Sequence, residues 1–465
     1  MPKTQRIRDP IHDLIVFDEN DEIDQLAWAL LETPEFQRLR RVKQLGVSEF
    51  VFPGATHTRF SHSVGVFHVA RQLLRLIQRE IDFGRVEGNY DQEKGKIALL
   101  AALLHDIGHG PFSHAFEEAR KSIFKRRGIA KIKKHEIWTA EIIENPEGCI
   151  FPILENWSEG SAKRIADLLR AEIPSDMYHS IVSSSFDADR LDYLQRDRVM
   201  TGAGSGVFDF SWLLDNVRVA SIDVSPPSED GGDSVYSHSF CLGYKARDAA
   251  EDFLLSRYRL YTNVYFHKTT RGIEQLLTAL YSRIAELAEA KAFDQLGLSE
   301  DEPLVRFLCP DGESLSIYLK LDDTVIWGVI ERLERAPDAR LATLASRIRS
   351  RKKMLAIDIQ NQFPDDSELQ RRAQHMLDEK FREQLGLSVF RDEALLTLYG
   401  EIGADDTKAQ KRLMIQLPDK HPREITNFKD ATIVGSEQKR RFLRYYFLEE
   451  SDHRKACETL EGIRR

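Results

Sequence analysis

The chain has 465 residues, of which 42% are hydrophobic and 30% are charged, a balance typical of globular proteins. Its formal net charge of −9 excludes a general attraction for nucleic acid or acidic membranes, so an anionic ligand must bind at a local basic site. No apolar run reaches the length of about 18 residues that a membrane-spanning helix needs, which argues against a membrane protein.

Neither the N-terminus nor the cysteines indicate secretion. Residues 1–14 lack the apolar segment of a secretory signal. The four cysteines lie far apart, without a CxxC pair or the spacing of a disulfide framework (Cys149, Cys241, Cys309 and Cys457). Because isolated thiols are typical of a reducing compartment, we predict a cytoplasmic protein.

Residues 22–219 are predicted to form a series of amphipathic helices. Thr33 and Pro34 suit the N-cap and the first turn of a helix over residues 34–45. Over residues 56–77, apolar side chains recur at steps of three and four, the spacing of one helix face (Phe60, Val64, Phe67, Ala70, Leu74 and Ile77).

The next elements are a central helix and a β-hairpin. Residues 94–104 are almost wholly apolar, which predicts a buried helix that ends at a cluster of breakers (Gly108, Gly110 and Pro111). Two short β-rich runs within residues 217–243 flank the polar segment 225–234, which predicts a hairpin with a solvated loop. A helical pattern returns over residues 245–294.

Beyond residue 297 the pattern mixes helices, such as residues 322–336, with short β-rich pieces (305–310, 352–359, 387–390 and 412–417). We therefore predict a mainly α-helical fold with a small β-hairpin, followed by a smaller α+β C-terminal portion. The predicted division is a domain of residues 1–295 and a C-terminal portion of residues 296–465.

Histidine, aspartate and arginine concentrate in four stretches (54–65, 103–118, 133–138 and 186–197). The pair His105-Asp106 ends an apolar helix, where an unpaired charge would cost several kcal/mol and metal coordination would offset that cost. A buried histidine can instead donate to a backbone carbonyl, and for one isolated pair this is the favoured interpretation. With His62 and the aspartates of residues 187–192, a His/His/Asp/Asp set becomes available that suits Fe, Mn, Zn or Mg.

Longer motifs make the interpretation specific. THTRFSHSVGV, HDIGHGPFSH, a following HE and DADRLDYLQRD, in that order, resemble the HD-domain deoxynucleoside triphosphate (dNTP) triphosphohydrolases. ETPEFQRLRRVKQLG and VFPGATHTRFSH resemble the branch whose animal member joins a SAM domain to the HD domain. The resemblance covers roughly residues 6–270 and, since no SAM-like segment precedes residue 6, concerns the HD part alone.

The resemblance implies metal-dependent hydrolysis of a dNTP to a deoxynucleoside and inorganic triphosphate. The HD phosphohydrolase domain would then be residues 1–295, with the metal site within residues 54–200. The family's ligands for a divalent ion (Mn, Fe, Mg or Zn) fall on His62, His105, Asp106 and Asp189. Its catalytic positions fall on His109, His114, His135 and Glu117, where Glu117 replaces the family's aspartate. We predict His114 and His135 for proton transfer.

Substrate and regulatory positions follow from the same resemblance. The sugar and triphosphate positions fall on Gln44, Arg59, Arg190, Tyr193, Asp197, Arg257 and Tyr265. Arg59 would grip phosphate with its planar fork, Arg190 replaces the family's lysine, and Tyr265 would exclude a 2′-hydroxyl by packing against C2′. A regulatory nucleotide at the interfaces of a homo-oligomer, a tetramer or a dimer, would contact Glu32, Gln37, Arg40, His267 and Lys268. Glu32 replaces the family's guanine-reading aspartate.

Less specific interpretations stand beside these. The histidines His12, His57 and His68 are not expected to be ligands. Tyr193 and Tyr265 would be ordinary core aromatics without the resemblance, and Asp192 and Asp197 could form only surface salt bridges.

The basic run of residues 120–134 is interpreted first as a solvated, mobile insertion and second as an anchor for triphosphate or nucleic acid. Two rival functions remain: a phosphohydrolase acting on another nucleotide, and a regulator that binds nucleotides or nucleic acid through a structural HD site. Nucleic acid is the less favoured partner.

Overall fold

The protein was analysed as a computed structural model. It describes residues 3–171, 174–204, 207–223, 236–398, 400–401, 412–433 and 439–464. No helix within these ranges is long and apolar enough to cross a membrane.

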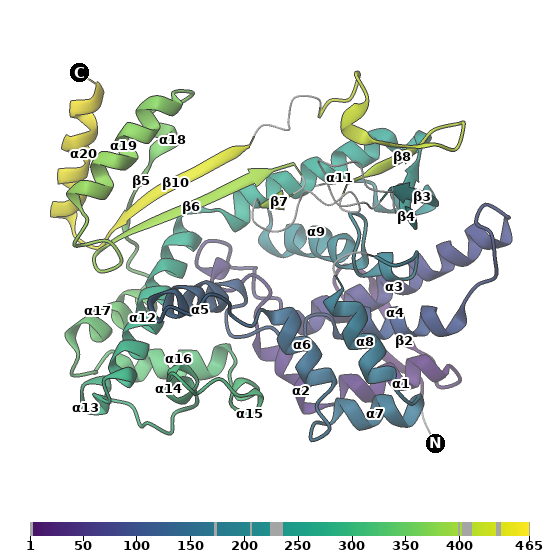
Figure 1. The fold of residues 1–465 in the computed structure, drawn as a ribbon, viewed down its shortest axis with the longest axis horizontal. Coiled ribbons are helices and arrows are strands. Elements are labelled where there is room, and N and C mark those ends of the chain that lie inside the picture. Colours follow the sequence, from purple (N-terminus) through teal and green to yellow (C-terminus); the bar gives the residue numbers. More distant parts are fainter. Residues whose placement is uncertain are drawn as a thin grey trace.

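A bundle of helices forms the first part of the fold (Figure 1). It follows an antiparallel hairpin of β1 (Gln5–Asp9) and β2 (Asp13–Phe17). Its helices are α1 (Glu22–Leu31), α2 (Pro34–Gln37), α3 (Arg59–Asp82), α4 (Gln92–Leu104), α5 (His114–Arg126), α6 (His135–Ile143), α7 (Ile150–Trp157), α8 (Ser161–Arg170), α9 (Ala188–Thr201) and α10 (Phe210–Asp215). As predicted, α4 is the buried central helix, and it packs against α3 and α8.

The predicted hairpin is present as β3 (Val217–Asp223) and β4 (Tyr236–Gly243), which pair antiparallel. Its predicted loop, residues 225–234, lies outside the described residues. β8 (Met414–Gln416) extends the sheet by pairing parallel with β4, and β9 (Pro422–Glu424) pairs with β8. The order of this sheet is β3-β4-β8-β9.

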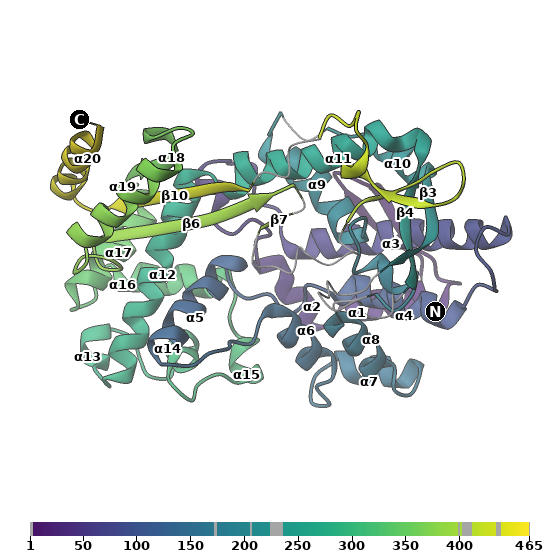
Figure 2. The same ribbon diagram turned by 45° about the horizontal axis from the view of Figure 1, so that its top comes forward.

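Helices α11 (Arg247–Leu260) and α12 (Lys268–Glu289) follow, joined through a π-helical turn at Tyr261–Tyr265. The later helices are α13 (Phe293–Leu296), α14 (Pro303–Leu308), α15 (Leu315–Tyr318), α16 (Asp323–Leu333), α17 (Ala339–Arg349), α18 (Ile359–Gln362), α19 (Ser367–Lys380) and α20 (Glu450–Arg464). A second sheet, in the order β5-β10-β6-β7, contains β5 (Leu355–Asp358), β6 (Val389–Thr397), β7 (Gly400–Glu401) and β10 (Arg440–Phe447). In Figures 1 and 2 its long strands β6 and β10 run between the α19–α20 end and the region of α11. The predicted fold class is confirmed.

The two largest apolar cores of the described residues lie under the helices, and a smaller one lies between α19, α20 and the second sheet. The first gathers α1, α3, α4, α6, α8, α9 and α11 with the β3–β4 hairpin, and the second gathers α5, α12 and α14–α17. Segment 412–433 returns from the C-terminal portion to the first core, where Ile415 and Ile425 are fully buried. The division near residue 295 therefore remains a prediction, because the chain beyond it contributes to both cores.

Two predicted elements are wrong in detail. Residues 305–310 were expected as a β-rich piece, but α14 includes Leu304, Phe307 and Leu308, which are buried in the second core. Pro303 starts that helix, so local β-propensity is overridden by packing. The helix expected over residues 34–45 has only the four residues of α2, capped by Thr33 as predicted, and continues as a 3-10 turn at Arg38–Arg41.

The favoured interpretation of the basic run 120–134, a solvated, mobile insertion, is wrong for its first part, residues 120–127. Its first part is the end of α5, which packs against α12. Arg120 is buried and its guanidinium donates to Glu313 and to the Lys133 carbonyl. The arginines at the end of α5 form ion pairs with carboxylates of α12 (Arg126–Glu286, Arg126–Glu289 and Arg127–Glu289). These partners are distant in the sequence, so composition alone could not reveal them.

Candidate metal and phosphohydrolase site

Two histidines and two aspartates meet where α3, α9 and the end of α4 approach one another. His62 Nε2, on α3, lies 2.9 Å from Asp189 Oδ1 on α9 and 3.7 Å from Asp106 Oδ2. His105 Nε2, just after α4, lies 3.4 Å from Asp106 Oδ1 and 3.8 Å from Asp189 Oδ1. The structure thus brings together the four residues that the resemblance predicts as metal ligands.

The chemistry of this cluster fits a divalent cation. His105 Nδ1 donates to the Ala102 carbonyl, while its Nε2 is buried without a hydrogen-bond partner and lies beside the carboxylates of Asp106 and Asp189. Burial alone would lower the pKa of His62, but the carboxylates of Asp189 and Asp192 outweigh burial and raise that pKa to about 10. The cluster therefore attracts positive charge. Asp189, with 39% of its side chain exposed, is on the solvent side.

A second layer of buried charges fixes His62. His62 Nδ1 donates to Asp192 Oδ2 over 2.8 Å, which leaves Nε2 directed at the cluster. Asp192 also contacts His12 Nε2 at 2.6 Å and accepts from the Arg196 guanidinium, which reaches Asp9. Asp192 is fully buried, so the interpretation of this residue as a surface salt bridge is wrong.

Gly65 makes room for this layer. A Cβ atom at Gly65 would come 2.0 Å from Asp192 Oδ1 and 2.4 Å from Arg196 Nη2. Any side chain there would displace the aspartate that holds His62, one turn earlier on the same helix. The glycine is therefore required by the close approach of α9 to α3.

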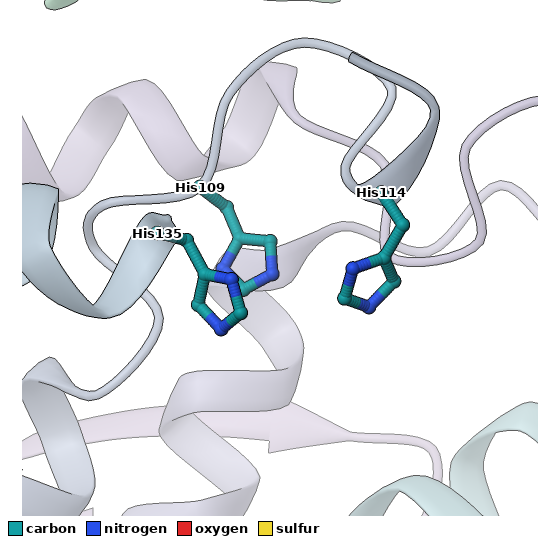
Figure 3. Close-up of side chains that lie close together, drawn as sticks. All are labelled: His109, His114 and His135. Carbon is teal, nitrogen blue, oxygen red and sulfur yellow. The ribbon is translucent and has the colours of Figure 1, made fainter. Parts of the chain in front are cut away.

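The three histidines predicted for catalysis form a second group beside the first (Figure 3). The rings of His109 and His135 lie 3.8 Å apart between centroids, and His114 faces them from the start of α5, at 5.5 Å from His109 and 5.9 Å from His135. His109 Nδ1 lies 3.3 Å from Asp106 Oδ1, so Asp106 contacts both groups. The side chain of His114 is 70% exposed.

Glu117 orients this group. Its Oε1 accepts from the backbone N–H of His135 at 2.7 Å and lies 2.9 Å from His135 Nδ1. Burial would raise the pKa of Glu117, but hydrogen bonds from His114 and His135 hold it far below its usual range. The reciprocal effect overcomes the burial of His135 and raises the pKa of that imidazole. Burial and the nearby Arg59 charge lower the pKa of His109 well below its usual value.

Arg59 and the loop before α5 connect the two groups. Arg59 is buried, donates from Nη1 to Asp106 and donates from Nε to Ser113 Oγ over 2.8 Å. Ser113 Oγ in turn donates to the Lys43 carbonyl over 2.7 Å. Gly108, in the same loop, lies so close to α6 that a Cβ would come 2.2 Å from the Thr139 nitrogen.

Of the residues predicted for sugar and triphosphate, Arg190, Tyr193 and Asp197 lie on α9 and Tyr265 lies in the π-helical turn. Asp197 is buried rather than superficial: it contacts His57 Nε2 at 2.7 Å and accepts from the Tyr265 hydroxyl at 2.7 Å. Arg190 donates to Asp187 and to the Ser184 carbonyl.

Other members of that set are also buried or half-buried. Gln44 Oε1 is buried without a hydrogen-bond partner. The Arg257 guanidinium lies 5.4 Å from the centroid of Tyr261, and Tyr193 packs against the first core.

The predicted regulatory residues form two groups. Gln37 Oε1 accepts from Arg40 Nε over 2.8 Å, and the Arg40 guanidinium lies 3.5 Å above the Phe60 ring. Glu32, at the end of α1, accepts from the Trp28 indole. His267 caps the start of α12, where Lys268 is the first residue, and its ring contacts Phe52.

Sequence reasoning missed the buried partners of the predicted residues, chiefly Asp192 and His12. The spacing of Asp189 and Asp192 was the one available signal, since residues three apart share a helix face. His12 and His57, which were not expected to be ligands, each contact an aspartate of the surrounding layer. His68 stacks beside His12 and contacts Gln72.

Comparisons with known proteins identify the family and the fold. The HD-domain family profile matches residues 59–197. YwfO of Bacillus subtilis is 34% identical over 345 residues, which are 74% of this chain and 70% of that protein. The deoxynucleoside triphosphate triphosphohydrolase SAMHD1 of Gallus gallus is 28% identical over 341 residues, 68% of this chain and 50% of that protein. A crystal structure of a phosphohydrolase from Bacteroides thetaiotaomicron matches the fold with a TM-score of 0.71 at 23% identity, over 96% of this chain and 100% of that one.

The contact from Asp192 to His62 generates a prediction about metal affinity. Asp192→Asn should weaken Mn²⁺ binding about 10- to 100-fold, because the amide cannot accept from all the donors that fix the ligand. Titration calorimetry with Mn²⁺ measures the change. Asp197→Asn is the matched control, because Asp197 is equally buried on the same helix but contacts His57 instead. Equal Mn²⁺ affinity of Asp192→Asn and the wild type would contradict the role given to Asp192.

Proposed function

This chain belongs to the HD-domain family, and we propose that it hydrolyses dNTPs to a deoxynucleoside and inorganic triphosphate in a metal-dependent reaction. The observation that supports this most is the contact of one buried carboxylate, Asp106, with both groups of histidines. One group has the composition of a cation site and the other has imidazoles held by a carboxylate. A purely structural site would need only the first.

The four residues of the first group would hold the ion (His62, His105, Asp106 and Asp189). A divalent cation there would supply positive charge to the α-phosphate and lower the pKa of a water molecule. The exposed side of Asp189 leaves the cluster open to solvent and substrate. In the proposed reaction a water oxygen bonds to the α-phosphorus, the bond from that phosphorus to O5′ breaks, and O5′ takes up a proton.

His135 is suited to supply that proton. Its Nδ1 is held by Glu117, so Nε2 is the nitrogen left to face a substrate. The raised pKa of His135 keeps the ring protonated at higher pH than a free imidazole. His114, exposed on the other side of His109, is the second candidate for proton transfer.

Arginines and tyrosines would bind the rest of the nucleotide. Arg59 pairs with Asp106 of the ligand cluster, Arg190 follows Asp189 on α9 and pairs with Asp187, and the planar groups of both arginines suit phosphate oxygens. The hydrogen bond from Tyr265 to Asp197 fixes the ring that would pack against C2′. A 2′-hydroxyl would then clash with the ring.

We further propose that a nucleotide regulates assembly of a homo-oligomer. Arg40 and Gln37 are ordered by their mutual hydrogen bond, and Lys268 lies at the positive N-terminal end of the long helix α12. Both features suit a triphosphate. The coupling would arise because the nucleotide binds the assembled state better than the dispersed one.

Product analysis tests the proposed reaction. Each dNTP is incubated with Mn²⁺, Mg²⁺ or Fe²⁺, and the products are separated by anion-exchange chromatography. The expected product is intact triphosphate, released in one step. This release should disappear when a chelator is added and in Asp106→Ala. Release of orthophosphate would favour a phosphohydrolase acting on another nucleotide. An electrophoretic shift of RNA or single-stranded DNA by the protein, without turnover of any nucleotide, would favour a regulator that binds nucleotides or nucleic acid.

The position of Tyr265 predicts selection of deoxyribose. Tyr265→Ala should lower the ratio of kcat/KM for dATP to kcat/KM for ATP about ten-fold, because it removes the ring that would exclude the 2′-hydroxyl. Tyr265→Phe is the control, since it keeps the ring and loses only the bond to Asp197. Equal wild-type rates on dATP and ATP would rule out this selection.

Arg40 provides the test of regulation. Added nucleotides should raise both the solution mass, measured by light scattering, and the turnover of a dNTP, and Arg40→Ala should abolish both responses. Arg41→Ala is the matched control, because Arg41 pairs with Asp322. If neither mass nor rate of the wild type responds to any nucleotide, the regulatory proposal fails while the catalytic one stands.

A further inference from the structure

The loop between α4 and α5 is held by residues that follow residue 300, where no motif was found. This loop, residues 105–113, carries His109 and leads into His114. It starts in the first apolar core, where Ile107 is buried, and ends in the second, where Phe112 is buried. Its geometry therefore depends on how the second core is anchored to the first.

The end of this loop is strained. Phe112 and Ser113 have φ angles of 52° and 55°, a left-handed conformation that residues with a side chain rarely adopt. Such a conformation persists only where its surroundings fix it. Ser113 is the N-cap of α5, yet its hydroxyl makes no capping bond, because it is engaged with Arg59 and the Lys43 carbonyl.

Asp323, at the start of α16, closes this arrangement. Its Oδ1 accepts from the Phe112 N–H at 2.7 Å, and its Oδ2 accepts from the Lys43 N–H at 2.9 Å. Only 3% of Asp323 is exposed. Since Ser113 donates to the Lys43 carbonyl, the three segments form a closed ring of hydrogen bonds. One turn later on α16, the Trp327 ring packs edge-to-face on Phe112.

Tyr318, on α15, holds the other half of the loop. Its hydroxyl donates to the Gly108 carbonyl over 2.7 Å. Its ring stacks on Trp138 of α6 at 4.3 Å, one turn from His135. Tyr318 thus ties the residue before His109 to the helix that presents His135.

We propose that Asp323 and Tyr318 are positioning residues, which set the places of His109 and His114 relative to the ligand cluster. This inference rests on the proposed function for its consequence in catalysis. The structural part of the inference, that these two side chains order the loop, does not depend on the proposed function.

The first test is hydrogen exchange measured by mass spectrometry on the full chain. Asp323→Asn should speed exchange of the amides of Phe112 and Lys43 at least about ten-fold, because one buried N–H then faces an amide NH₂. Asp322→Asn is the matched control: asparagine can still cap α16, and Asp322 pairs with Arg41 rather than the loop. Equal exchange in the two variants would overturn the proposal.

Turnover is the second test. Asp323→Asn should lower kcat for a dNTP about 10- to 100-fold, with KM and bound metal changed far less, because the Phe112 amide that it releases lies two residues from His114 and six from Asp106. Tyr318→Phe should lower kcat in the same way. Tyr281→Phe is its control, since the Tyr281 hydroxyl lies in the same core without a hydrogen-bond partner.

The outcomes separate the two proposals. If Asp323→Asn fails to fold, the comparison of Tyr318→Phe with Tyr281→Phe decides. Unchanged kcat and unchanged exchange of the loop amides in Tyr318→Phe would overturn the inference. If the wild type hydrolyses no nucleotide while the loop amides respond as expected, the proposed function fails and the ordering of the loop is supported.

Discussion

The buried ion pair between Arg59 and Asp106 joins the two groups of histidines, and the geometry of both depends on it. Asp106 faces the ligand histidines on one side and His109 on the other, while Arg59 also donates to Ser113, beside His114. Both partners are almost excluded from water. Loss of either would leave an uncompensated buried charge, at a cost of about 3–5 kcal/mol. The pair therefore couples the position of the proposed cation ligands to that of the imidazoles that would transfer protons.

Charge alternates outward from this pair, so that each buried ion has an opposite neighbour. His62 is followed by Asp192, Asp192 by Arg196, and Arg196 by Asp9 on the N-terminal hairpin. In a low-dielectric interior such a series is stable only when every member is paired. Solvent reaches the arrangement at its edges, where Asp189 and His114 are exposed. Water and a charged substrate can therefore approach without disturbing the buried layer.

How much of the fold and of the site could be predicted depends on how far apart in the sequence the contacting residues lie. The order of the motifs was enough to expect His62, His105, Asp106 and Asp189 together, because each lies on or next to a helix that its own sequence specifies. The interpretation of Asp192 as superficial failed because two of its partners, His12 and His62, come from other elements, and only Arg196, one turn later on α9, is connected to it by local sequence. The interpretation of the first part of the basic run as a mobile insertion was wrong for the same reason, because the carboxylates that pair with its arginines lie some 160 residues later. Pairing across such separations is invisible to periodicity and composition.

The loop before α5 shows what this limit means for function. The motif HDIGHGPFSH specifies which groups are present, but its left-handed residues Phe112 and Ser113 are unfavourable on their own by about 1–3 kcal/mol each. The free energy that offsets this strain comes from Asp323, Tyr318 and the second core, and both of these side chains lie beyond the recognised motifs. Two chains with identical motifs could thus hold their histidines differently. Because proton transfer and phosphoryl transfer both depend steeply on distance, the C-terminal portion would act on the rate of the proposed reaction through the geometry of this loop.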